Sequence, residues 1–415
     1  MTLIKTSLLN AIAVMVKMLT LLGLNKILAV YVGPAGYAAI GQLQNAIQMI
    51  LTVSGGALNT GVTKYTAEYG DDEVKQVSLW RTAFKINLYA GLVISLLLVL
   101  FNEPLAIYFL GSIEYKNVFL WFAATIILFV LNSFFIAIVN GKKEIFHYVK
   151  INIVGSLVSL LVTGLCAFYF GLYGALIALV TNQSIVFFIT LILCRNLIWF
   201  KWKSFFGALD KSEASKLSKF ALAALTSAIV VPLSHILVRG HLVDTFGWES
   251  AGYWDAMWRI SSIYLMFITM TLSVYYLPRL SEITTKEEMQ KELLKGYKLI
   301  MPLLVVISFT IYLLRDFIIF LLFSPDFQPM ERLFAWQLIG DTIKMASWLL
   351  AYVLLGKAMI KTIMVSEIIF AFTFYILTVV ISTVSGFDGV VQAYAFNYIL
   401  YFMFVFITLR IRKII

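Results

Sequence analysis

Long, continuous apolar runs restrict the fold of this chain more than any other feature. Hydrophobic residues make up 61% of its 415 residues and charged residues 13%, well below the roughly 25% that is usual in a soluble domain. The apolar runs are about 20 residues long, and they do not alternate with polar positions as the strands of a membrane barrel do. The sequence therefore predicts an all-α integral membrane protein.

Twelve such runs are present, and we expect each to be a transmembrane helix. They cover residues 7–31, 38–60, 82–102, 118–140, 151–170, 174–194, 216–238, 251–277, 298–314, 332–355, 361–382 and 389–409.

The distribution of basic residues predicts the orientation of these spans. One set of loops, together with both chain ends, holds 23 of the 32 lysines and arginines, whereas the opposite loops hold four: Lys116, Arg239, Arg315 and Arg332. Because basic residues accumulate on the cytoplasmic side, we expect both termini to be cytoplasmic. The net charge of +10 is then mostly a signal of topology, and the chain has no soluble basic domain for binding nucleic acid.

The two halves of the chain repeat each other at a spacing of 215 residues. Equivalent residues recur at the same place in the predicted topology: Lys64 and Arg279, Trp121 and Trp336, Gly141-Lys142 and Gly356-Lys357, Gly171 and Gly386, Gly174 and Gly389. We therefore expect an N-terminal six-helix lobe at 1–196, a cytoplasmic linker at 197–215 and a C-terminal six-helix lobe at 216–415. Paired halves are typical of transporters.

The stretch Trp254–Ser273 is apolar enough to cross a membrane, yet it contains Asp255 and Arg259 one helical turn apart. Ser262, Thr269 and Ser273 continue the same face. Charged groups at membrane depth are costly and usually face a bundle interior or a wet cavity. The alternative is a self-neutralising pair that only stabilises its own helix.

Polar and cationic groups also mark the first two spans. The second span has one polar face, which either lines a cavity or makes helix–helix hydrogen bonds, and which contains Gln44, Asn45, Gln48 and Asn59. The first span carries Lys17 near its middle and Lys26 closer to the outer end. Lys64 lies at the inner end of the second span.

Spans 10 and 11 carry further ionisable residues. Asp341 and Lys344 lie on one stripe, where they can neutralise each other or line a cavity, and Glu367 lies about two turns into the next span. A carboxylate at such a depth suits proton coupling, although structural pairing explains it as well.

Two predicted inside loops, near 63–80 and 279–297, mix acidic and basic residues. Their charges recur at helical spacing, which fits either surface helices along the membrane or solvated connectors.

Several chemical signatures are absent from the sequence. It contains no P-loop, no H-E-x-x-H and no nucleophile elbow, and its histidines lack the spacing of metal ligands. Its two cysteines lie in apolar runs and indicate neither a disulfide nor a metal site. We therefore expect a transporter rather than an enzyme, with no cofactor, no metal and no catalytic residue.

Several runs of the sequence resemble a known family in order along the whole chain. They are Gly33-Pro34-Ala35-Gly36, Gly61-Val62-Thr63-Lys64-Tyr65, Leu217-Ser218-Lys219-Phe220, Tyr276-Leu277-Pro278-Arg279-Leu280-Ser281, Leu314-Arg315-Asp316-Phe317 and Leu333-Phe334-Ala335-Trp336-Gln337-Leu338-Ile339-Gly340-Asp341. These runs are similar to the Wzx flippases of enterobacterial O-antigen and common antigen.

This resemblance implies the V-shaped, MATE-like fold of the multidrug/oligosaccharidyl-lipid/polysaccharide exporter superfamily. It also implies movement of undecaprenyl-pyrophosphate-linked oligosaccharide to the periplasmic leaflet of the bacterial inner membrane, by alternating access and beside other glycan assembly proteins such as a polymerase or a chain-length regulator. By this resemblance the pyrophosphate ligands are Arg259, Lys17, Lys64 and Lys26. The family often has arginine where three of these are lysine, and lysine cannot make a bidentate phosphate contact. Trp254, Trp258 and Tyr264 would contact sugars.

Two other functions compete with this interpretation. A drug–cation antiporter of the same superfamily would need a net acidic cavity, whereas the predicted spans hold more basic than acidic residues. A membrane glycan polymerase would need a large outside loop, which the predicted topology does not offer.

Overall fold

The computed structural model is helical throughout the part of the chain that it describes, with no strand among those residues. It describes the backbone of residues 3–415, and side chains from residue 12 onward except at 220, 222–224, 227, 267, 270, 271, 273 and 274. The side chain of Ser273, one member of the predicted polar face, thus lies outside the described residues.

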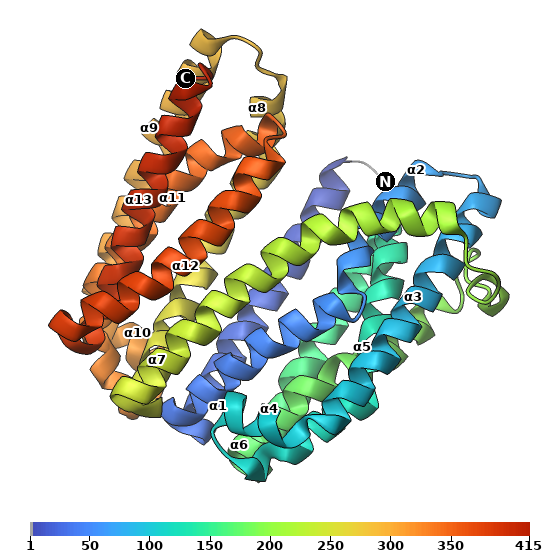
Figure 1. The fold of residues 1–415 in the computed structure, drawn as a ribbon, viewed down its shortest axis with the longest axis horizontal. Coiled ribbons are helices and arrows are strands. Elements are labelled where there is room, and N and C mark those ends of the chain that lie inside the picture. Colours follow the sequence, from blue (N-terminus) through green and yellow to red (C-terminus); the bar gives the residue numbers. More distant parts are fainter. Residues whose placement is uncertain (1–2) are drawn as a thin grey trace. The chain divides into compact units, whose positions relative to one another are not determined.

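The thirteen α-helices of this described part run in chain order (Figure 1). They are α1 (Leu3–Val53), α2 (Asn59–Glu68), α3 (Glu73–Leu100), α4 (Asn102–Leu110), α5 (Lys116–Gly141), α6 (Ile145–Cys194), α7 (Lys211–Thr271), α8 (Leu277–Glu282), α9 (Lys286–Leu313), α10 (Arg315–Leu322), α11 (Phe334–Gly356), α12 (Ile360–Ser385) and α13 (Gly389–Ile411).

Three of these helices each contain two predicted spans joined at a glycine. The backbone leaves helical geometry at Gly33 in α1, at Gly171 in α6 and at Gly247 in α7, where φ is 69°, 57° and 85°. A residue without a Cβ adopts these positive φ values at little cost. Within the described residues, eight helical runs are long and apolar enough to cross a membrane. The number of crossings and the orientation of the termini stay predictions.

The predicted repeat is visible in the backbone itself. Gly171 and Gly386 share nearly the same unusual conformation, with φ/ψ of 57°/−138° and 62°/−146°. Lys143 and Ala358, also 215 residues apart, both have positive φ, at 59° and 53°. Left-handed backbone is uncommon for residues other than glycine. Its recurrence at equivalent positions indicates that both halves build the same turns.

The chain forms two compact units. Unit 1 contains residues up to Val32 together with Ala39–Pro232, and unit 2 contains Gly33–Ala38 together with Leu233–Ile415. These differ from the predicted lobes in two places, because residues 33–38 pack with the second unit and residues 216–232 with the first.

The predicted linker at 197–215 is folded onto unit 1 rather than extended. Phe205 is fully buried, and its ring lies 5.2 Å from that of Phe135 and 6.1 Å from those of Phe134 and Trp80. Burial of large rings in this arrangement contributes substantially to stability. Phe205 of the linker is therefore part of the core of unit 1.

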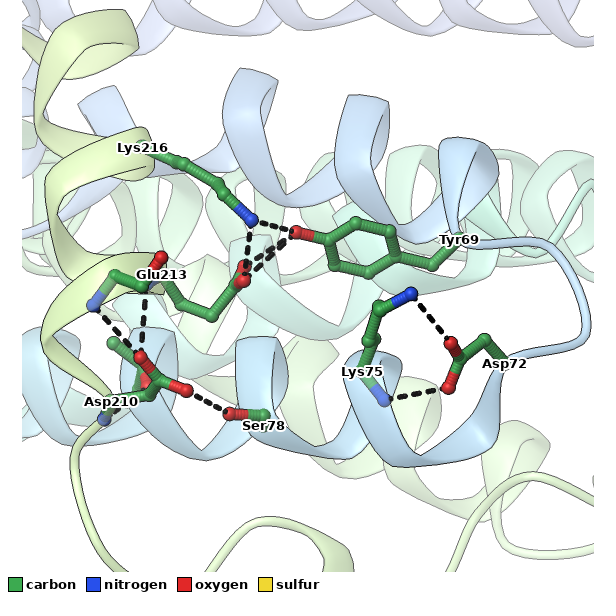
Figure 2. A network of polar contacts seen from close by, with 9 residues as sticks. Tyr69, Asp72, Lys75, Ser78, Asp210, Glu213 and Lys216 are labelled. Carbon is green, nitrogen blue, oxygen red and sulfur yellow. Dashed lines mark hydrogen bonds and ion pairs between the residues drawn. The ribbon is translucent and has the colours of Figure 1, made fainter.

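Polar contacts fix the start of α7 against α2 and α3 in the same unit (Figure 2). The Tyr69 hydroxyl donates to the Glu213 carboxylate at 2.8 Å and accepts from Lys216 Nζ at 2.8 Å. The hydrogen bond to the Glu213 carboxylate raises the pKa of Lys216. Asp210 accepts from Ser78 Oγ at 3.0 Å. These contacts explain why the first turns of α7 belong to unit 1.

Unit 2 incorporates the short segment 33–38 through close packing. A Cβ on Gly252 would lie 1.9 Å from the Pro34 carbonyl oxygen, so only glycine fits there. The ring of Tyr37 lies 5.9 Å from that of Phe323 and 5.4 Å from that of Phe327. This packing places Tyr37 next to the charged part of α7.

The two charged loops are mostly helical. Residues 63–80 comprise the end of α2, a turn and the start of α3, and residues 279–297 comprise the end of α8, a turn and the start of α9. Their helical charge spacing reflects these helix ends.

Truncation of Phe205 tests the packing of the linker. Phe205→Ala is expected to lower the free energy of unfolding by about 3 kcal/mol, because it removes a fully buried ring from a packed cluster. Thermal unfolding of the purified protein in detergent measures the effect. The control Ile198→Ala, at a side chain that is 93% exposed, should change it by no more than about 0.5 kcal/mol. Equal effects of the two variants would contradict the packing.

The contacts of Asp210 predict a pH dependence. Hydrogen bonds from Ser78 and from the backbone N–H groups of Glu213 and Ser212 lower the pKa of Asp210. Its stabilising contribution is therefore present above the unfolded pKa of about 3.9 and is lost as pH falls through the lower folded value. Thermal midpoints of wild type and Asp210→Asn should differ at pH 7 and converge below about pH 4. A difference that does not depend on pH would rule this out.

Candidate functional site

A buried cluster of one carboxylate and two guanidinium groups lies in unit 2. Asp255 Oδ1 lies 2.5 Å from Arg239 Nη2, and Asp255 Oδ2 lies 3.0 Å from Arg259 Nε. All three residues come from α7, with Arg239 before the Gly247 kink and the other two after it. The kink allows one helix to place charges from two segments around a single carboxylate.

The cluster carries an excess of positive charge. The side chains of Arg239 and Asp255 are 2% and 6% exposed, whereas that of Arg259 is 16% exposed. The Arg259 guanidinium also lies over the Tyr37 ring, 4.6 Å from its centroid. Because one carboxylate offsets only one of the two cations, the cluster can attract an anion. Arg259 is its most accessible member.

The prediction that Arg239 lies in an outside loop is wrong. The helix continues past residue 238 as far as Gly247, and Arg239 is buried inside the unit. The Arg-Gly-His sequence there looks like a loop because it is polar. A buried Asp255 that pairs with Arg259 through one oxygen still needs a donor for its second oxygen. A search for that donor among the nearby basic residues could have identified Arg239.

A second buried network surrounds Asp341. Its Oδ2 accepts hydrogen bonds from Ser261 Oγ at 2.6 Å and from the Tyr264 hydroxyl at 2.6 Å. Its Oδ1 accepts from the Tyr394 hydroxyl at 2.8 Å and from Gln337 Nε2 at 3.3 Å. Four donors satisfy a carboxylate that is fully buried. Sequence reasoning did not identify Ser261 or Tyr394, because their partner is 80 and 53 residues away.

Among the described residues, no direct ion pair joins Asp341 and Lys344, although each of the two charges acts on the other. Instead, Lys344 Nζ lies among aromatic rings, 5.0 Å from that of Trp258, 5.1 Å from that of Trp348 and 5.5 Å from that of Tyr398. Cation–π contacts stabilise such an ammonium group. Lys344 and Asp341 thus have different direct contacts on one helix, but both contact Tyr394.

Two of the three aromatic residues predicted to contact sugars, Trp254 and Tyr264, are engaged in contacts within the protein, whereas Trp258 is half-buried. Trp254 is fully buried, and its ring lies under the Arg239 guanidinium at 5.4 Å. The Tyr264 hydroxyl is used by Asp341. Of the predicted polar face of this helix segment, Ser262 and Thr269 donate to carbonyl oxygens of their own helix.

Unit 1 contains a separate cationic pocket. Lys17 lines a cavity of about 220 Å³ together with Asn152, Ser156, Ser159 and Gln183. None of the described residues that line it carries a carboxylate. A lone ammonium group with hydroxyl and amide neighbours can bind a phosphate or the hydroxyl groups of a sugar.

The other predicted site residues of unit 1 are more dispersed. Lys26 is half-buried, and Lys64 is exposed, with Glu68 at 3.7 Å and the Tyr65 ring at 4.8 Å. Neither lines the pocket of Lys17. On the predicted polar face of the second span, Gln48 is exposed, whereas three residues are half-buried: Gln44, Asn45 and Asn59.

Glu367 in α12 of unit 2 is also half-buried. The structure does not test whether it couples to protons. Within the described residues, no three His, Cys, Asp or Glu side chains are arranged to hold a metal ion.

Removal of the Asp255 charge tests the cluster. Asp255→Asn leaves two buried guanidinium groups without a counter-charge, and we expect a loss of about 3–5 kcal/mol in stability. Arg239→Met in the same chain removes one of these cations, so the double variant should be more stable than Asp255→Asn alone. Thermal unfolding in detergent measures both variants. A single variant as stable as wild type would show that the cluster is not an ion-paired unit.

Comparisons with known proteins agree with this architecture. The family described as polysaccharide biosynthesis protein matches residues 3–284. The lipid III flippase of Escherichia coli (strain K12) is 31% identical over 404 residues, which is 97% of both chains.

An inward-facing multidrug resistance MATE transporter of the MOP superfamily has a TM-score of 0.82 at 14% identity, over 96% of this chain and 94% of that chain. Lipid II flippase MurJ in an inward closed conformation has a TM-score of 0.74 at 13% identity, over 99% and 89%. These two structures show a MATE-like fold, and the family match together with the Escherichia coli relative shows that the chain belongs to the polysaccharide biosynthesis protein family.

Proposed function

We propose that this protein is a flippase that moves an undecaprenyl-pyrophosphate-linked oligosaccharide from the cytoplasmic to the periplasmic leaflet by alternating access. The observation that carries the proposal is the excess positive charge of the buried Arg239–Asp255–Arg259 cluster. A pyrophosphate is the charged part of such a lipid, and burying it in hydrocarbon without cations is costly. The relative named lipid III flippase supports this class of cargo.

Each residue of the cluster has a separate role in this proposal. Arg259 contacts the phosphate, because it is the most accessible of the three and presents a planar, charged fork. Arg239 is almost fully buried and neutralises the other oxygen of Asp255. Asp255 orients Arg259 and competes with the phosphate for it.

Unit 1 contributes the Lys17 pocket to the proposal. Its hydroxyl and amide groups suit hydrogen bonds to sugar hydroxyls, and its ammonium group suits a phosphate oxygen. Lys26 and Lys64 are weaker candidates, because Lys64 is exposed and already close to Glu68. A lysine supplies a point charge and not a bidentate contact, so each lysine contact is less specific than that of Arg259.

Neither rival function fits these sites as well. A cation antiporter would need a carboxylate able to bind the cargo, but two of the three acidic residues in the predicted spans are already engaged, Asp255 by two arginines and Asp341 by four donors. The similarity to the MATE structure at 14% identity shows fold alone. A glycan polymerase is disfavoured because the relatives are named as flippases, which confirms the expectation of a transporter rather than an enzyme.

The chain is a multi-pass membrane protein. The proposal extends this to twelve spans in two six-helix lobes, with cytoplasmic termini in the bacterial inner membrane. Other glycan assembly proteins would supply and consume the lipid-linked cargo beside it. Whether that cargo is lipid III of the common antigen or an O-antigen repeat unit is decided by which strain defect the gene complements.

Substitution of the proposed phosphate contacts tests the function. Arg259→Ala and Lys17→Ala should each reduce flipping by about ten- to a hundredfold, the loss expected for one charged hydrogen bond. Transport of lipid-linked oligosaccharide into the outer leaflet of vesicles, with surface glycan display in complemented cells, measures the effect.

Two control variants accompany this test. Lys17→Arg keeps the charge and should retain most of the activity, and Lys64→Ala should have a small effect because Lys64 is exposed. Full flipping by both Arg259→Ala and Lys17→Ala at normal expression would disprove the phosphate assignment.

A further inference from the structure

A large basic cavity lies in unit 2, apart from the buried cluster. Its volume is about 830 Å³, and three backbone segments form it: the turn before α9, the turn before α12 and the residues that follow α13. By the distribution of basic residues, all three are predicted to lie on the cytoplasmic side. The cavity therefore occurs where lipid headgroups are expected.

Five cations line this cavity, and none of the described residues that line it is acidic. They are Lys286, Lys357, Lys361, Arg412 and Lys413. Three acidic residues adjoin the lining in sequence without forming part of it, namely Glu282, Glu287 and Glu288, and Glu282 lies 3.7 Å from Arg279. Clustered cations attract anions, and their effect is strongest in a concave site.

The backbone adds further donors to the same cavity. Helix α12 begins at Ile360, and its N-cap residue Met359 makes no side-chain cap. The first N–H groups of a helix have no acceptor within the helix, and the helix dipole favours an anion there. Ile360, Lys361 and Thr362 all line the cavity. A long helix thus directs unsatisfied donors toward the five cations.

The equivalent turn of unit 1 shows what is missing in unit 2. Lys142, the counterpart of Lys357, donates to Gln76 Oε1 at 3.0 Å. Helices α3 and α9 are capped by Asp72 and Thr285, whose side chains each accept from the backbone N–H three residues later. Counted from these caps, Gln76 corresponds to Met289, which lines the cavity and cannot accept such a bond. Lys357 instead donates to the Ile283 carbonyl oxygen.

We propose that this cavity binds the phosphate group of a membrane lipid. Its lining combines cations with apolar side chains, among them Ile283, Met359 and Ile414, which suits a headgroup whose phosphate is joined to an apolar body. An anionic phospholipid and the pyrophosphate of a lipid carrier share this chemistry. The phospholipid case does not depend on the proposed function, whereas the carrier case rests on it.

Lipid retention by the purified full-length protein tests the site. The protein in detergent is incubated separately with phosphatidylglycerol, phosphatidylcholine and undecaprenyl pyrophosphate, and bound lipid is counted by native mass spectrometry. Lys361→Glu with Arg412→Glu should weaken binding of the anionic lipid about tenfold, because two contributing charges are reversed. Both side chains are exposed, so the fold should tolerate the change.

A matched control reverses two exposed lysines of α9 that do not line the cavity, Lys291→Glu with Lys295→Glu. It should bind anionic lipid as wild type does.

Retention of phosphatidylglycerol identifies a phospholipid site, and retention of undecaprenyl pyrophosphate alone identifies a carrier site. Equal retention of both anionic lipids by wild type and the Lys361/Arg412 variant would overturn the proposal. Binding is measured without transport, so an inactive flippase with intact binding would contradict only the proposed function.

Discussion

The sharing of Asp255 by two arginines is the interaction on which the interior of unit 2 depends. A single buried arginine or aspartate in a membrane bundle would be strongly unfavourable. Here Arg239 and Arg259 occupy both carboxylate oxygens, and the aromatic rings of Trp254 and Tyr37 cover the guanidinium groups. The arrangement requires the kink at Gly247 and the inclusion of segment 33–38 in unit 2. Local backbone geometry and buried electrostatics are therefore linked.

The internal repeat explains why the two halves share turns but differ in chemistry. Backbone conformation is retained at Gly171 and Gly386 and at Lys143 and Ala358. Side chains have changed on this common frame, as Gln76 and Met289 show at the turns next to Lys142 and Lys357. The shape of a turn depends on the φ/ψ values of a few residues, whereas a polar contact depends on whether one acceptor side chain is present. The shared turns can therefore persist while single polar contacts are gained or lost.

Much of the fold could be predicted from the sequence, because a membrane leaves few options for apolar runs of this length. Each predicted span lies largely within helix, and the predicted repeat recurs in the backbone. The position of Arg239 was not predicted, since a polar run at the end of a span looks the same locally whether it enters water or a polar interior. The packing of Phe205 was also missed: the aromatic residues at 199–206 favour burial, but the sequence gives no sign of their long-range partners. For the site, the pair of Asp255 and Arg259 was found from its spacing of four residues. Most partners of Asp341 and Lys344 come from distant helices, which no local pattern reveals, whereas Gln337 and Trp348 lie four residues away on the same helix.

The cluster also bears on how a transported anion is released. A phosphate bound to an isolated buried arginine would be held too tightly to leave, since charge-assisted contacts strengthen as water is excluded. In the proposed mechanism, an arriving phosphate competes with the Asp255–Arg259 contact at 3.0 Å, which reforms when the phosphate departs. Arg239 keeps Asp255 in place during this exchange, because it occupies the other oxygen. A carboxylate between two cations therefore limits the affinity for the cargo, and a transporter needs limited affinity because its cargo must leave as readily as it enters.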